Sequence, residues 1–475
     1  MTWPAFVFWG LIALGIIAPG PLLLLYFFFS FGAFTALNLI PSETSTVVPQ
    51  TACAAFLVLK ILLSPGRISR AIDAAIDPAA LGFLFGFLAY GLFSSFVMPR
   101  LFAHMVDVVP MSNNVPWPVP LVPTGGNFNQ SLLTTLSVGV VLAFSLAGRN
   151  AAFRQHALRS LLVGGLVLIA TGLADLLVPA SVLEPFRNAY LVSVDNEVLG
   201  HRRLAGLMPE ASGFGPYCLV LAMNLFFLRP CFADRILRNI FAPAAAMVLF
   251  LMAALSTSST AYLGLAAFSL VLAANWLRRA LSSKALGRET LTLEAAAIVI
   301  GLIAIIAVLA FVPHAADPFY TMIDAMIFKK SQSASYIERS MWTRTALHAF
   351  FATDGLGVGL GSARSSNWFA AVLGNTGIVG AAFLSCFFLR LFLFRCWSKN
   401  PKTVEFVTGL RLSLVPLALM MAASWTLADF GAGTGALLGL IASLTAPTRS
   451  LAAFAQSHEI RAQFQEEPRI QSADG

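Results

Sequence analysis

Apolar residues fall into long blocks separated by shorter polar stretches along the 475-residue chain. The blocks are about 16 to 22 residues long, which is the length needed to cross a bilayer as a helix. They lack the alternation over about ten residues that barrel strands would show, and helices satisfy their own backbone groups in hydrocarbon. The expected spans lie near 5–19, 21–39, 48–63, 79–98, 131–147, 159–178, 212–228, 239–256, 260–277, 292–312, 368–394, 411–428 and 433–446.

The first forty residues allow two interpretations. The apolar run is interrupted at Pro19-Gly20-Pro21, which is compatible with a tight hairpin of two spans or with one span and an interfacial segment. We therefore expect an all-α polytopic membrane protein with about 12 or 13 transmembrane helices. Residues 1–447 would form a single membrane domain, and residues 448–475 a flexible cytoplasmic tail.

Composition supports a membrane protein and argues against a nucleic-acid-binding one. The chain is 58% hydrophobic and 11% charged, with a mean hydropathy of +0.80, and a soluble core of this length could not hide so much apolar surface. The formal net charge is +8, but the cations gather in one alternate set of short connecting loops. The positive-inside rule puts that set in the cytoplasm. It contains Arg67, Arg70, Arg149, Arg154, Arg159, Arg229, Arg235, Arg238, Arg278, Arg279, Lys284, Arg288, Arg395, Lys399 and Lys402.

Three longer loops, 99–130, 179–211 and 313–367, then face the exterior. The third loop contains IERSMWTRTALHAFF. Its residues Ile337, Met341, Ala346 and Phe350 have helical spacing. We expect a short amphipathic helix that lies against the membrane or covers the end of the bundle.

The stretch GLGVGLGSARSSN, residues 355–367, has a glycine at every second position beside Arg364. It lacks the Lys-Ser/Thr of a P-loop, and no strand precedes it. In one interpretation the glycines let the chain turn and pack tightly onto the bundle. In the other, backbone N–H groups at Gly359 and Gly361, together with Arg364 and Asn367, hold an anionic group near a helix N-terminus.

Several arginines occur in the second and third loops, where the positive-inside rule disfavours them. Each could contact lipid headgroups or pair with Glu184, Glu197 or Glu338. As a group they fit a pyrophosphate carried on a lipid, because the guanidinium fork binds phosphate and keeps its charge at any relevant pH. The arginines are Arg187, Arg202, Arg203, Arg339, Arg344 and Arg364.

Glu210 follows Arg203 in RRLAGLMPEASGFG, at the mouth of an expected span. A partly desolvated carboxylate there would act as a general base; the alternative is an ordinary carboxylate favoured by a helix dipole. HExxH and DxD patterns are absent from the sequence. We expect neither a metal nor another cofactor.

Four segments together resemble the superfamily of O-antigen polymerases and ligases, over roughly residues 200–446. The resemblance implies a polytopic inner-membrane glycosyltransferase that uses glycans linked to undecaprenyl pyrophosphate. Ligases of the superfamily typically carry a His-Asn pair before the Gly-x-x-Gly, whereas Ser366 precedes Asn367 here, and the turn Ser258-Ser259-Thr260 lacks their arginine. Both departures favour a polymerase. The segments are RRLAGLMPEASGFG (202–215), LSTSSTAYLGL (255–265), ERSMWTRTALHAFFATDGLGVGLGS (338–362) and SNWFAAVLGNTGIVG (366–380).

The expected activity is therefore metal-independent polymerisation of lipid-linked repeat units into exopolysaccharide or O-antigen at the periplasmic face. Glu210, Arg339 and Arg364 are the candidate catalytic residues. A ligase and a lipid flippase or transporter are the alternatives. Expected partners are the undecaprenyl-pyrophosphate-linked glycan, membrane lipids, and chain-length regulator and flippase proteins of the same pathway, but no nucleic acid. The candidate substrate-binding residues are Arg202, Arg203, Arg344, Gly359, Gly361 and Asn367.

Overall fold

The computed structural model describes residues 2–40, 46–111, 115–189, 197–198, 201–281 and 334–445. The expected span 292–312, the first part of the third loop and the tail 448–475 lie outside these residues. In the described part of the chain, strands are confined to two short antiparallel hairpins, β1 (Asp107–Val108) with β2 (Val119–Pro120), and β3 (Glu197–Val198) with β4 (His201–Arg202).

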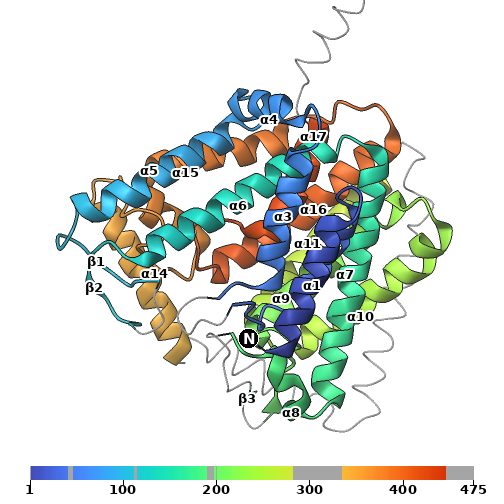
Figure 1. The fold of residues 1–475 in the computed structure, drawn as a ribbon, viewed down its shortest axis with the longest axis horizontal. Helices are drawn as coiled ribbons and strands as arrows, with labels where there is room; N and C mark the ends of the chain where they lie inside the picture. The colour runs from blue at the N-terminus through green and yellow to red at the C-terminus, as the bar shows by residue number, and fades with distance from the viewer. Residues whose placement is uncertain are drawn as a thin grey trace, which may run out of the picture.

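Helices make up nearly all the rest of the described chain (Figure 1). Short 3₁₀ turns cover Glu184–Phe186 and Arg229–Cys231, and a π-helical turn, Leu237–Phe241, precedes α10. The α-helices are α1 (Trp3–Ile17), α2 (Leu22–Phe31), α3 (Pro49–Leu62), α4 (Arg67–Ile76), α5 (Gly82–Leu101), α6 (Gly125–Ala147), α7 (Ala151–Leu177), α8 (Ala180–Leu183), α9 (Ala211–Leu228), α10 (Ala242–Leu255), α11 (Ser259–Leu281), α14 (Ala334–Ala352), α15 (Trp368–Leu393), α16 (Pro401–Ser424) and α17 (Gly431–Thr445).

Within the described residues, eight helices are long and apolar enough to cross a membrane. A ninth span would arise from α3 and α4 together, but these two helices are bent by 106° at their junction. Three further apolar helices, α1, α2 and α17, are shorter. The expectation of an all-α multi-pass membrane protein is thus confirmed, while the number of 12 or 13 spans stays a prediction.

The break in the first forty residues is confirmed, since α1 ends at Ile17 and α2 begins at Leu22. Lys60 of α3 donates its ammonium hydrogens to the carbonyl oxygens of Gly15, Ile16 and Ala18. These are carbonyls at the end of a helix, which lack an intrahelical partner. A cation from a neighbouring helix therefore caps α1 and fixes its position beside α3.

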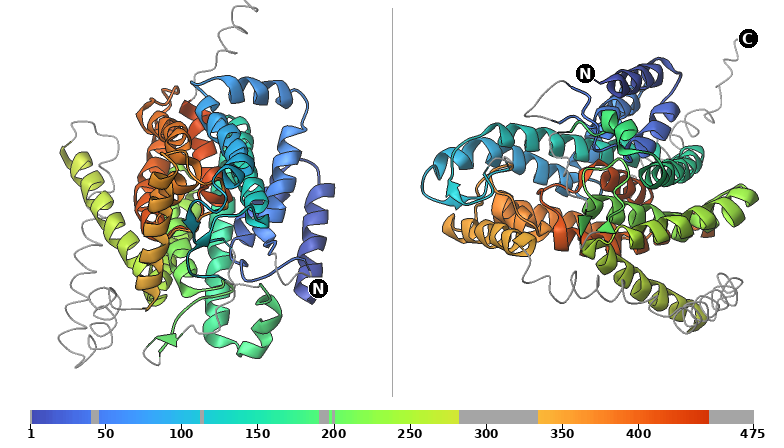
Figure 2. Two further views of the ribbon diagram at one scale, coloured as in Figure 1. Left: turned by 90° about the vertical axis from the view of Figure 1, so that its left-hand side faces the viewer. Right: turned by 90° about the horizontal axis from the view of Figure 1, so that it is seen from below.

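Close helix pairs form the core, among them α6 with α17, α9 with α10, and α5 with α15. Figures 1 and 2 show the long helices α5, α6 and α15 running side by side. In α17, Gly435 and Gly439 are four residues apart, and a Cβ at these positions would lie 2.9 Å and 2.6 Å from the carbonyl oxygens of Ser137 and Val141 of α6. Small residues at this spacing let the two backbones approach closely, as is common between membrane helices.

The succession of antiparallel helices gives the bundle two ends. The described parts of the loops 102–124 and 178–210 (102–111, 115–124, 178–189 and 203–210), the turn 256–258 and the start of α15 share one end, which we call the loop end. The connections 63–81 and 229–241 share the opposite end. Helix α7 joins the two, and its 27 residues correspond to about 40 Å.

The expected helix in the third loop is α14, and its predicted packing face is confirmed at Ala346 but not at Ile337. Ala346 and Ala349 are fully buried, whereas Ile337 is 60% exposed. The contact is a close one, because a Cβ on Gly374 of α15 would lie 2.8 Å from the carbonyl oxygen of Ala346. Small residues rather than bulky apolar ones therefore decide how α14 lies on α15.

Candidate functional site

The segment 203–210 at the loop end is held by a buried carboxylate. Asp175, near the end of α7, is 3% exposed and accepts hydrogen bonds from the backbone N–H groups of Ala205 and Gly206 at 3.0 and 2.9 Å. Arg187 forms an ion pair with Asp175 at 2.6 Å and donates to the carbonyl oxygen of Gly206 at 2.7 Å. The Asp175–Arg187 pair, which we call the Asp175 brace, fixes the backbone from which Arg203 projects.

Arg203 is partly buried beside the turn that joins α10 to α11. Its Nε donates to Thr257 Oγ1 at 3.0 Å and its Nη2 to the Thr257 carbonyl oxygen at 3.2 Å. Thr257 has a φ of 50°, a left-handed conformation that is rare for a β-branched residue. Such strain persists only where the surroundings impose it. The turn thus presents the hydroxyl and the carbonyl oxygen of Thr257 to one guanidinium group.

Arg203 lies close to three other ionisable side chains. Burial lowers the pKa of the Arg203 guanidinium, the nearby charges of Glu210 and Tyr262 raise it, and Arg339 lowers it further. Arg339 comes from α14, more than 130 positions away in the sequence. The structure therefore brings together two of the predicted arginines and the predicted base, and it adds Tyr262, which the sequence did not single out.

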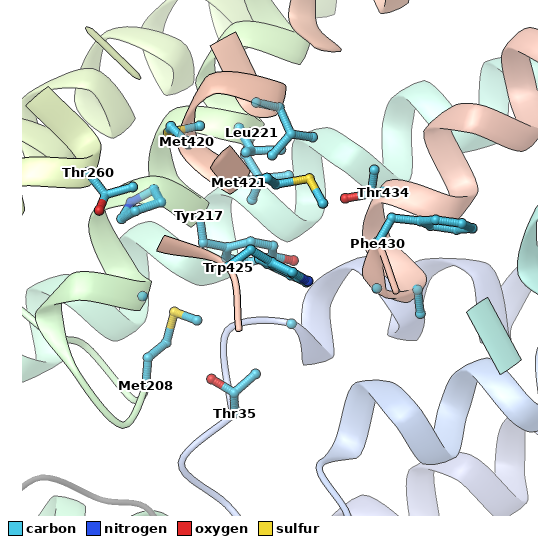
Figure 3. A pocket seen from close by; sticks show the side chains of 18 of the residues that line it. Thr35, Met208, Tyr217, Leu221, Thr260, Met420, Met421, Trp425, Phe430 and Thr434 are labelled. Atoms are coloured by element: carbon cyan, nitrogen blue, oxygen red, sulfur yellow. The ribbon is translucent and has the colours of Figure 1, made fainter. Parts of the chain in front are cut away.

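Arg339 also lines a cavity of about 390 Å³ between the membrane helices, a size typical of sites for small or elongated ligands. Side chains from several helices, including Tyr217 and Met421, surround this space together with Met208 from the segment before α9 (Figure 3). Most of the walls are apolar, formed by residues such as Phe29, Met208, Leu221, Met420, Met421, Phe430 and Leu437.

A few polar groups interrupt these apolar walls. Asn224 is 1% exposed, and its Oδ1 has no hydrogen-bond partner among the described residues; the same holds for Thr35 Oγ1. Trp425, which also lines the cavity, donates its indole N–H to the Asp429 carbonyl oxygen at 2.9 Å. An apolar cavity with a cation at its edge suits an amphipathic molecule with an anionic head.

The glycine-rich stretch makes close packing contacts, as the first of its two interpretations predicts. Gly355, Gly357, Gly359 and Gly361 all have positive φ, from 79° to 92°. The N–H of Val358 donates to the Gly374 carbonyl oxygen, and that of Gly359 to the Asn375 carbonyl oxygen, both at 2.8 Å. A Cβ on Gly361 would lie 2.2 Å from the Gly126 carbonyl oxygen. The stretch is a strap pressed between α5, α6 and α15, which supports the packing interpretation, while the assignment of Gly359 and Gly361 to an anion cradle stays a prediction.

Arg364 belongs to the same strap and does not line the cavity. Its guanidinium carbon lies 4.8 Å from the centre of the Trp342 ring, and its Nη2 donates to the Met111 carbonyl oxygen at 3.3 Å. Burial lowers its pKa, and the charge of Glu338 opposes that shift. These contacts tie the loop 102–124 to α14. Arg364 is therefore engaged in structural contacts, and its partner Trp342 lies one helical turn from Arg339.

Glu210 lies between the cavity-lining residues Met208 and Ser212, and it is exposed. It is the N-cap residue of α9, and the Ser212 hydroxyl donates to its Oε2 at 2.6 Å. The desolvation that the hypothesis of an activated base required is therefore absent. Its position at the positive end of a helix dipole matches the alternative interpretation.

The remaining predicted residues lie apart from this cluster. Arg344 is exposed and lines a different hollow, of about 530 Å³, with His104, Asp107 and His348. The Asn367 side chain accepts from the Ala370 N–H at 3.1 Å and caps α15. Arg202 lies in β4, and its side chain is outside the described part of the structure.

Sequence reasoning missed the Asp175–Arg187 brace and the Thr257 turn. Asp175 carried a usable signal, because an ionisable residue within a membrane span is expected to have a partner. Thr257 carried none, since neither its type nor its spacing predicts a left-handed backbone. Across the described residues, no group of three His, Cys, Asp or Glu side chains is placed to hold a metal ion.

Comparison with known proteins identifies no relative. No protein-family model matches this chain, and no curated protein matches it.

Proposed function

We propose that this protein is a glycosyltransferase of the bacterial inner membrane that polymerises lipid-linked oligosaccharide repeat units into exopolysaccharide or O-antigen. The single observation that carries the proposal is Arg339, which lines an apolar cavity between membrane helices and lies close to Arg203. A polyisoprenyl pyrophosphate has the matching chemistry, with an apolar chain for the cavity and an anionic group for the two guanidinium groups. The resemblance of residues 200–446 to the O-antigen polymerases and ligases supports the same assignment.

In the proposed reaction, a hydroxyl of an incoming repeat unit attacks the anomeric carbon of the growing chain. The new glycosidic bond forms as the bond from that carbon to the pyrophosphate oxygen breaks, and the hydroxyl proton passes to a base. Arg203 and Arg339 stabilise the negative charge that develops on the departing pyrophosphate. Glu210, exposed beside the cavity, is the candidate acceptor of the proton, and it would act as an ordinary solvated carboxylate without activation by burial.

The loop end of the bundle would face the periplasm, because the opposite end carries most of the short basic connections. The polymer would then grow where flipped lipid-linked units arrive. Flippases that deliver these units and proteins that regulate chain length are the proposed partners.

The test compares surface glycan and lipid-linked intermediates in a strain that lacks the gene and carries wild type or a variant. Arg339→Ala should leave single repeat units on the carrier and reduce polymer at least 100-fold, the effect of losing one preorganised charge at a transition state. Arg235→Ala is the matched control, since Arg235 is exposed at the opposite end of the bundle.

Each alternative function gives a different result in the strain without the protein. Full-length polymer retained on its carrier would make the protein a ligase, and repeat units trapped on the inner leaflet would make it a flippase. Wild-type polymer length and yield with Arg339→Ala would remove Arg339 from the site.

A further inference from the structure

Helix α4 lies across the end of the bundle opposite to the candidate active site, at 106° to α3 (Figures 1 and 2). Its alanines Ala71 and Ala74 are buried against the bundle. Ile68, Ile72 and Ile76 are 55%, 54% and 73% exposed, and their spacing of four puts them in one stripe. A short helix with an exposed apolar stripe on one side and charges on the other is typical of a helix in the plane of the membrane interface.

Three arginines meet where α4 packs on α6. Arg67 and Arg70 belong to the first turn of α4, and Arg149 lies between α6 and α7. The Arg67 Nη1 and Arg149 Nε atoms are buried without a hydrogen-bond partner in the described part of the chain. Buried N–H groups of charged side chains are costly to leave unpaired. The arrangement is therefore suited to an anion that supplies the missing acceptors.

The protein itself supplies no such anion among the residues that the structure describes. Asp73 of α4 is exposed, and Asp77, the residue that follows α4, is half-buried. The single ion pair among the described residues joins Arg187 to Asp175 and does not involve these arginines. Burial lowers the pKa values of Arg67 and Arg149, and the charge of Arg70 lowers both further, with no carboxylate opposing it. The charge of Arg70 therefore repels those of both Arg67 and Arg149 in the structure as it stands.

We propose that Arg67, Arg70 and Arg149 bind the phosphate of an anionic phospholipid at this face of the membrane. The neighbouring isoleucine stripe favours a lipid over a free phosphate ion, because it would lie against acyl chains while the arginines hold the headgroup. Arg149 lies just before α7 and Asp175 near the end of the same helix, so the length of α7, about 40 Å, separates this site from the Asp175 brace. The proposal therefore concerns the opposite membrane face and does not depend on the proposed function.

Native mass spectrometry of the full-length protein in detergent tests the proposal directly. Phosphatidylglycerol and phosphatidylcholine with identical acyl chains are titrated against wild type and Arg67→Gln/Arg149→Gln. Wild type should prefer phosphatidylglycerol, and the double variant should lose roughly tenfold to thirtyfold of that affinity, while its phosphatidylcholine affinity stays unchanged. Arg235→Gln/Arg238→Gln removes the same charge elsewhere on the same face and should keep the preference.

Two further measurements keep the result decisive. Arg70→Gln should not impair folding, because Arg70 is exposed and its Nε donates to the carbonyl oxygen of Gly66 in the same turn. The substitution should weaken phosphatidylglycerol binding severalfold. Equal lipid preference in wild type, the double variant and Arg70→Gln would overturn the proposal. So would displacement of bound phosphatidylglycerol by an equal concentration of inorganic phosphate, which would identify a site for a free anion.

Discussion

At the scale of single residues, arginines that look alike in the sequence have different surroundings. Arg364 stacks on Trp342 and binds a backbone carbonyl, so its charge is engaged in holding a loop. Arg339, one turn before Trp342 on the same helix, lines the cavity. Because the charge of Arg364 is already engaged and Arg339 lines the cavity, Arg339 is the better candidate for substrate contact.

Arg203 allows charge and geometry to be tested separately. Arg203→Ala should lower polymer yield at least 100-fold, whereas Arg203→Lys keeps the charge but loses the fork that binds both oxygens of Thr257, and should lower it about tenfold. Polymer assays in membranes, normalised to protein abundance, measure both. If lysine and alanine give the same yield, the role of Arg203 is confined to the structure of the turn.

The Asp175 brace should be a stability determinant. Asp175→Asn removes the charge opposite Arg187 and should lower the free energy of unfolding by about 3 kcal/mol, because it leaves a largely buried guanidinium without its partner. Thermal unfolding in detergent measures the change. Asp354→Asn, at an exposed position, should change the melting temperature little.

A double-mutant cycle then shows whether the pair acts as a unit. Asp175→Asn/Arg187→Gln should destabilise by clearly less than the sum of the single variants, since the second substitution removes the charge that the first leaves unpaired. Strictly additive effects would mean that the two side chains stabilise the protein independently.

At the scale of elements, the glycine strap acts as a spacer that cannot accept side chains. Gly361 has a φ of 81°, and a Cβ there would lie 2.2 Å from a backbone oxygen. Gly361→Ala should therefore destabilise the protein by about 2 kcal/mol or more. Gly125→Ala, at the start of α6 where a Cβ meets no atom within 4 Å, should be neutral. Thermal unfolding of both variants decides the matter, and equal melting temperatures would refute the packing role.

At the scale of the whole molecule, the distribution of cations predicts which end of the bundle faces the cytoplasm. His348→Cys lies at the loop end and Asp73→Cys on α4, and both positions are exposed. In cells with a permeabilised outer membrane, an impermeant maleimide should label only His348→Cys, and Asp73→Cys only after disruption of the inner membrane. The reverse pattern would invert the orientation and move the candidate site to the cytoplasm. Labelling is judged against the protein with its native cysteines alone.

The sequence by itself determined the class of the protein, the hairpin break before Leu22 and the existence of α14. These are local properties, because hydropathy adds up residue by residue and the Pro-Gly-Pro sequence at 19–21 interrupts a helix through its own backbone constraints. For the arginines, local properties of the sequence predicted only that several of them share one side of the membrane.

Only the tertiary structure decided which of those arginines meet. Arg203 finds its oxygens on Thr257, 54 positions away, and Arg339 reaches the cavity from a helix further still along the chain. The packing of α14 by Ala346 and Ala349, and the contact of the glycine strap with α6, depend equally on neighbours brought in from distant segments. Contacts of this kind follow from shape complementarity between helices, which no local pattern records.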